Sequence, residues 1–154
     1  MHEIVYILEL IGTAAFAVSG AVVAIKKETD VFGVVFIAIT TAVGGGIFRD
    51  LLIGKLPPVA FQQYEYVFVA AVTAIGIFLF AYFRRDKNHH QHWATIDRVN
   101  NIFDALGLGA FTVIGMNRAI VAGFGDNVFL VVFLGMITGI GGGILRDTLV
   151  RDIP

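Results

Sequence analysis

The chain has 154 residues, of which 57% are hydrophobic and 15% charged, with a mean hydropathy of +0.82. Soluble domains are about 45–50% apolar and about 25% charged, so this composition excludes a water-soluble fold. The absence of cysteine excludes disulfides, zinc–thiolate sites and thiol catalysis, and the net charge of −1 gives no indication of binding to nucleic acid.

Long apolar runs predict the membrane-spanning helices. A helix needs roughly 20 mostly apolar residues to cross the hydrocarbon core of a bilayer. The first run has no basic segment before it, so we interpret it as a permanent span rather than a cleaved signal peptide. The fourth run contains Asp104 and Arg118 and is the weakest by hydropathy. The five expected spans are residues 10–25, 31–48, 66–83, 102–123 and 127–145.

The distribution of lysine and arginine predicts the orientation. If the N-terminus lies outside, eight basic residues fall on the inner side and three on the outer side. Cytoplasmic loops carry an excess of basic residues, so we expect a multi-pass protein of the inner (plasma) membrane with its N-terminus outside. Lys26 and Lys27 follow the first span and are expected to anchor the inner face, with binding of anionic lipid headgroups as a second role.

An internal repeat organises the chain. Residues 30–57 align without a gap on residues 127–154, with 14 identities in 28 positions, and residues 9–25 align on residues 104–120. The first copy of the unit has three spans, and an odd number of spans forces the second copy to enter the membrane in the opposite sense. Inverted repeats of this kind occur mainly in proteins that move solutes.

The predicted fold is therefore all-α: a polytopic transmembrane helix bundle with two inverted three-helix repeats, the second incomplete in this chain. We expect the first repeat at residues 1–83, a basic cytoplasmic connector at residues 84–99, and the first two helices of the second repeat at residues 100–154. The connector contains three histidines, which we interpret as solvated residues of a polar loop rather than as a metal site. They are His89, His90 and His92.

A glycine triplet lies two thirds along the second span and again in the fifth. Each glycine costs roughly 1 kcal/mol relative to alanine inside a helix, so three in a row favour a kink or a break. Irregular backbone at membrane depth is tolerated only where protein buries it or water reaches it, which indicates a cavity or pore where freed carbonyls bind a cation. The alternative is that the triplets permit close helix packing. The residues are Gly44, Gly45, Gly46, Gly141, Gly142 and Gly143.

An Arg–Asp pair follows each triplet: Arg49 with Asp50, and Arg146 with Asp147. Ionisable groups inside a span usually face the bundle interior and form pairs. We expect the two pairs at opposite mouths of one path, where the carboxylates concentrate cations. The alternative is structural, with the aspartate capping nearby backbone and the arginine locking the interface between the repeats.

Arg118 has no basic counterpart in the first unit, where Val23 occupies the matched position. It is a candidate for gating or for holding a lipid phosphate, and a snorkelling residue at the outer face is the alternative. Glu9 and Asp104 are matched acids for which we favour a structural role at the repeat interface, with attraction of cations as the second interpretation. The sequence shows no Ser-His-Asp arrangement, P-loop or zinc motif, so we expect neither an enzyme nor a metal or cofactor.

The GGGIFRD and GGGILRD motifs, the opening GTAAFAVSGAVVAIKK and the two three-span units resemble the prokaryotic branch of the trimeric intracellular cation (TRIC) channel family over essentially the whole chain. The resemblance implies a homotrimer among membrane lipids, with a potassium-selective pore in each subunit lined chiefly by the kinked second and fifth helices. It implies that the two triplets are the kink residues, and that Arg118 acts in gating or lipid binding. Members of the family have a sixth and usually a seventh helix, which this sequence does not contain.

Two other functions fit the same pattern. A secondary transporter of a small solute such as glycine would share the inverted repeat and the broken helices, and a non-transporting scaffold is the third hypothesis. The lack of an obvious substrate-sized cluster of polar residues favours ions. Discrete current steps in a planar bilayer would distinguish a channel from a transporter, which would instead show saturable uptake.

Overall fold

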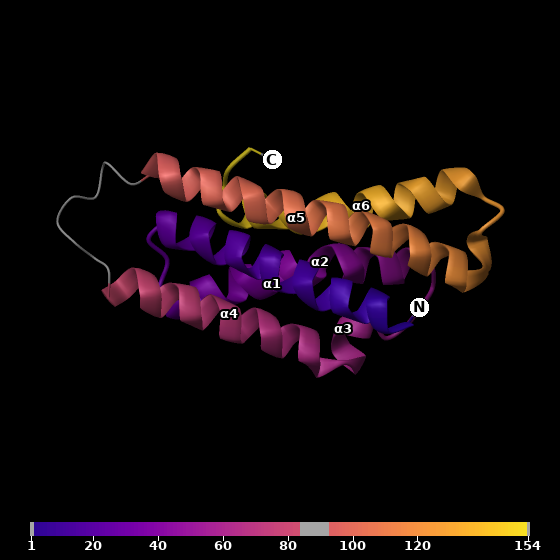
Figure 1. The fold of residues 1–154 in the computed structure, drawn as a ribbon, viewed down its shortest axis with the longest axis horizontal. Helices are drawn as coiled ribbons and strands as arrows, with labels where there is room; N and C mark the ends of the chain where they lie inside the picture. Colours follow the sequence, from indigo (N-terminus) through magenta and orange to yellow (C-terminus); the bar gives the residue numbers. More distant parts are fainter. Residues whose placement is uncertain (1, 84–92, 154) are drawn as a thin grey trace.

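The computed structural model describes residues 2–83 and 93–153, which fold into a bundle of helices. Its long helices are α1 (His2–Lys26), α2 (Val31–Leu52), α4 (Tyr64–Phe83), α5 (Trp93–Ala119) and α6 (Val128–Leu149). A short helix, α3 (Val59–Gln62), precedes α4, and α5 continues into the π-helical turn η2 (Ile120–Phe124). Figure 1 shows the long helices packed along the long axis, with α1 and α2 between α4 at one edge and α5 and α6 at the other.

Five helices within the described residues are long and apolar enough to cross a membrane, which confirms the predicted spans. Their ends differ from the prediction, most of all for α5, which begins at Trp93. The predicted connector at residues 84–99 is therefore too long. Residues 93–101 are largely polar, so hydropathy does not detect them, but they contain neither glycine nor proline and the helix continues through them. The three connector histidines lie outside the described residues.

The repeat is visible in the way α2 and α6 begin and end. The side chain of Asp30 accepts a hydrogen bond from the Gly33 N–H at 2.8 Å, and that of Asn127 accepts one from the Leu130 N–H at 3.0 Å. A side-chain cap of this kind satisfies an unpaired N–H at the helix start and is worth about 1 kcal/mol. At the other end, Ile53 and Val150 each donate a backbone hydrogen bond to the carbonyl of the matched arginine at 3.1 Å.

The two units are inverted about a pseudo-two-fold axis. Where α2 crosses α6, a Cβ atom on Gly45 would lie 2.2 Å from the Thr138 carbonyl oxygen, and one on Gly142 would lie 2.1 Å from the Thr41 carbonyl oxygen. The glycine of each unit therefore contacts the backbone of the matched threonine in the other unit. Since the earlier residue of one helix meets the later residue of the other, the helices are antiparallel, as the inverted repeat requires.

The two helices are not broken at the glycine triplets, so that part of the prediction is wrong, while the kink stays a prediction. The backbone is α-helical throughout α2 and α6, including residues 44–46 and 141–143. The first two glycines of each triplet form the surface on which α2 and α6 touch. A Cβ on Gly44 would lie 2.3 Å from the Leu145 side chain, and one on Gly141 would lie 3.0 Å from the Gly45 Cα. Close packing compensates for the low helix propensity of glycine, as small residues do between helices in bilayers.

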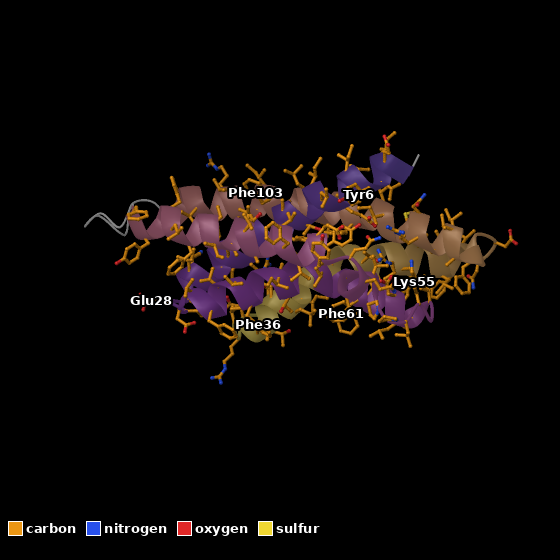
Figure 2. All side chains as sticks on the ribbon, turned by 90° about the horizontal axis from the view of Figure 1, so that it is seen from below. Tyr6, Glu28, Phe36, Lys55, Phe61 and Phe103 are labelled. Carbon is orange, nitrogen blue, oxygen red and sulfur yellow. The ribbon has the colours of Figure 1, made fainter. Side chains whose placement is uncertain are left out.

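The outer surface is apolar along the helices, as expected for contact with lipid or another subunit. Phe32 and Phe129, which occupy matched positions in the two units, are 75% and 80% exposed. Figure 2 shows large apolar side chains such as Phe36 and Phe61 on the outside of the bundle. A water-soluble protein would bury such side chains, so the exposed surface supports insertion in a membrane.

Candidate functional site

A small cavity lies among helices α1 to α5, beside the second half of α2. Its volume is about 40 Å³, which is enough for a few water molecules. Its lining mixes charged side chains with small and aromatic ones. The lining residues are Glu9, Thr13, Ala42, Val43, Gly46, Arg49, Asp50, Val59, Ala60, Tyr66 and Phe111.

The carboxylate of Glu9 joins three helices at this cavity. Arg118 on α5 donates to Glu9 Oε1 from Nε at 3.0 Å and from Nη2 at 2.6 Å. The Tyr66 hydroxyl on α4 donates to Glu9 Oε2 at 2.6 Å. Glu9 is 5% exposed, so both of its oxygens find partners where water has little access. Arg118, for which the sequence indicated no partner, is thus tied to the first span.

Arg49 and Asp50 form the second charged pair beside the cavity, and both are buried. Arg49 Nε donates to Asp50 Oδ1 at 2.9 Å, and the Val59 N–H donates to Asp50 Oδ2 at 2.8 Å. The aspartate therefore fixes the end of α2 to the start of α3. We name Glu9, Arg118, Tyr66, Arg49 and Asp50 the first cluster; its two acids and two bases have no net charge.

A second cluster lies near the end of α6, which the repeat matches to the end of α2. It consists of Ser19, Asp104, Arg146 and Asp147. Arg146 Nη1 donates to Asp104 Oδ1 at 2.6 Å and also to the Ser19 hydroxyl, and its Nε donates to Asp147 Oδ1 at 2.7 Å. The Ser19 hydroxyl donates to Asp104 at 3.0 Å. With two acids and one base, this cluster has a net charge of −1. It links α1, α5 and α6, in keeping with the interface role favoured for Asp104.

The two clusters are related by the repeat but are not identical. Arg146 matches Arg49, and Asp104 matches Glu9, whereas Arg118 corresponds to Val23 and so has no equivalent in the second cluster. The sequence did not point to Tyr66 or Ser19, because uncharged polar residues in an apolar span give a weak signal. Their burial among charged groups reveals them here: Tyr66 is 6% exposed and Ser19 is fully buried.

The separation of the clusters follows from helix geometry. Glu9 and Ser19 are ten residues apart on α1, which corresponds to about 15 Å along the helix axis. Between them lies an aromatic pair formed by Phe16 and Phe111, whose ring centroids are 5.4 Å apart at an interplanar angle of 12°. The polar groups thus lie at two depths, with an apolar layer between.

Lys26 and Lys27 lie at the end of α1, beyond the second cluster, and both form ion pairs. Lys26 pairs with Asp97 of α5, and Lys27 pairs with Asp152 at 2.6 Å. These partly exposed pairs connect the first unit to the second, although each contributes little to stability in water.

Comparison with known proteins places the chain among bacterial membrane proteins. It matches the family model described as Glycine transporter over residues 6–82 and 101–154. It is 39% identical to a UPF0126 membrane protein of Deinococcus radiodurans, a match that covers 96% of this chain and 63% of that protein. It is 36% identical to a UPF0126 membrane protein of Vibrio cholerae, with coverages of 99% and 59%, and 38% identical to the UPF0126 inner membrane protein YadS of Escherichia coli, with coverages of 98% and 68%.

The chain spans about six tenths of the length of the first two of these relatives. Among solved structures, it is similar to the TRIC trimeric intracellular cation channel orthologue from Rhodobacter sphaeroides, with a TM-score of 0.84 and 34% identity over 98% of this chain and 72% of that one. A prokaryotic TRIC channel in 0.5 M KCl gives a TM-score of 0.88 and 34% identity over 100% and 74% of the two chains. The chain therefore belongs to the family of the Glycine transporter model and to that of the prokaryotic TRIC channels, whose fold it shares at 34% identity.

Proposed function

We propose that this protein is a cation channel whose conduction path runs through the interior of each subunit. The observation that carries the proposal is the placement of two charged clusters, around the buried Arg49 and Arg146, at matched positions of an inverted repeat, with a cavity at the first. Charged groups inside a membrane protein are costly and mark the paths of ions and substrates. The likeness to solved cation channels supports the same function.

The proposed path does not pass between α2 and α6, because contacts at the glycine triplets fill the interface between these two helices. It follows the side of these helices that faces α1, α4 and α5, where the cavity lies. Gly46 lines that cavity, and a Cβ added to it would lie 3.7 Å from the Arg49 guanidinium; the matched Gly143 has similar space, at 3.9 Å from Arg146. The third glycine of each triplet thus leaves room beside an arginine, as a lining residue would.

We propose potassium as the permeant ion and a homotrimer as the assembly. A relative of known structure is described as a trimeric channel, and exposed aromatic residues on α2 and α6 offer apolar surface for contact between subunits. Native mass spectrometry of the detergent-purified protein is expected to give three times the 16.7 kDa chain mass, with bound lipids as additional mass. Lys26, Lys27 and Arg118 remain the candidates for lipid binding and gating.

Single-channel recording tests the function. The purified chain, fused into a planar bilayer with a gradient of KCl, is expected to give discrete current steps that reverse near the equilibrium potential of potassium. Reversal near the chloride potential would contradict cation selectivity. Saturable uptake of labelled glycine into proteoliposomes, without current steps, would favour a transporter, the activity in the description of the family model.

A further inference from the structure

We propose that the stacked pair of Phe16 and Phe111 is a hydrophobic gate across the conduction path. This inference rests on the proposed channel function and identifies the element that closes the path. The two residues occupy matched positions of the repeat, one on α1 and one on α5, so the pair lies at the pseudo-two-fold axis. They are 2% and 8% exposed.

Each ring is held over a glycine of the other unit. A Cβ added to Gly107 would lie 2.5 Å from the Phe16 ring, and one added to Gly12 would lie 3.1 Å from the Phe111 ring. Gly12 and Gly107 are themselves matched positions. The same glycine–phenylalanine contact is therefore made twice across the axis, and any larger side chain at the glycines would displace the rings.

The pair lies between the two charged clusters. Phe111 lines the cavity of the first cluster, and Thr13, one turn before Phe16 on α1, lines it as well. On the opposite side, Ser19 of the second cluster follows Phe16 by one turn. An ion moving from one cluster to the other must pass a layer in which the two rings offer no polar atom to replace its water.

An apolar constriction in a conduction path blocks ions by excluding water, and it conducts when the side chains move apart. Opening requires the rings to rotate to other rotamers or α1 and α5 to separate, because both rings are buried between these helices. A pair with a purely structural role would contribute to stability without controlling the flow of ions.

Flux measurements with the full chain in potassium-loaded liposomes test the gate. We expect Phe16→Ala and Phe111→Ala to raise potassium efflux on the order of tenfold, the factor produced if the barrier falls by about 1.4 kcal/mol. Phe111→Leu, which keeps the layer apolar, is expected to stay close to the wild type. Phe111→Tyr keeps the ring and adds a hydroxyl that attracts water, so it is expected to raise efflux even if the alanine variants do not fold.

The matched control is Leu134→Ala. Leu134 is fully buried but packs with Ala119 and Val131 in a separate apolar cluster, so its truncation makes a cavity without opening the axis. The gate would be overturned if the Phe111→Tyr and alanine variants gave the same efflux as Leu134→Ala. Single-channel steps in the wild type would still support the channel function in that case. Absence of potassium flux and current from every variant and the wild type would overturn both.

Discussion

At the scale of single residues, Glu9 is the point where the buried contacts of the first cluster converge. Its two oxygens accept three hydrogen bonds, from Arg118 and Tyr66, and so connect α1 to α5 and α4. The Arg118 side chain is 27% exposed, whereas that of Glu9 is 6% exposed. Removing the acid would therefore leave a guanidinium that is mostly shielded from water and has lost its counter-charge.

We expect Glu9→Gln to lower the free energy of unfolding by about 3 kcal/mol, the lower part of the range for breaking a buried pair, because Arg118 keeps some access to solvent. Thermal unfolding in detergent measures the change. The double variant Glu9→Gln with Arg118→Gln is expected to lose less than the sum of the single variants. Lys27→Gln, which breaks an exposed pair with Asp152, is the control and is expected to change stability by less than about 1 kcal/mol. Equal stability of the Glu9 and Lys27 variants would contradict this account.

At the scale of elements, the crossing of α2 and α6 shows that the glycines of a triplet differ in role. Gly45 and Gly142 lie against the carbonyl oxygens of the facing threonines, at distances that exclude any side chain. Gly46 and Gly143 face the arginine side chains across ordinary van der Waals space. Each triplet therefore contains both a contact position and a position with space for a methyl group, and alanine substitution distinguishes the two.

Gly45→Ala and Gly142→Ala are each expected to destabilise the protein by about 1–3 kcal/mol or more, because the helices must move apart to admit the methyl group. Gly46→Ala and Gly143→Ala, in the same helices, are expected to be neutral or to stabilise by up to about 1 kcal/mol, since alanine favours the helix. Unfolding in mixed detergent micelles measures all four. The prediction fails if Gly45 and Gly142 respond in the same way as Gly46 and Gly143.

At the scale of the whole molecule, the inversion of the two units determines which loops share a side of the membrane. Lys55 follows α2 and Asp152 occupies the matched position after α6. Figure 2 shows that Lys55 and Glu28, which lies in the turn before α2, are toward opposite ends of the bundle. Because Asp152 pairs with Lys27, it lies at the Glu28 end, so equivalent positions of the repeat face opposite sides.

The absence of native cysteine allows the orientation to be tested with single introduced cysteines. We expect Lys55→Cys to react with a membrane-impermeant maleimide in intact cells, because the N-terminus is predicted to lie outside. Asp152→Cys is expected to react only after the membrane is permeabilised. Labelling of both from the same side would contradict the inversion, and the reverse pattern would contradict only the predicted orientation.

The helices and their inverted arrangement could be predicted from the sequence, because hydropathy locates the helices and the internal repeat implies the inversion. It was insufficient for contacts between distant residues. The bond from Arg118 to Glu9 joins positions 109 residues apart, and nothing in either span indicates the other. The expected break at the glycine triplets does not occur for a related reason: composition shows low helix propensity, while the compensating contact comes from a different helix.

Arg118 also makes the two ends of the proposed path electrically unequal, since the first cluster is neutral and the second has one uncompensated acid. A cation entering beside Asp104 meets an attractive field that a cation entering beside Glu9 does not. Equal and opposite voltages in symmetric KCl are therefore expected to drive unequal currents, a rectification that weakens toward about 1 M salt, where the screening length shrinks to about 3 Å. A duplicated sequence with one unmatched arginine would in this way give a nearly symmetric fold a preferred direction of flow.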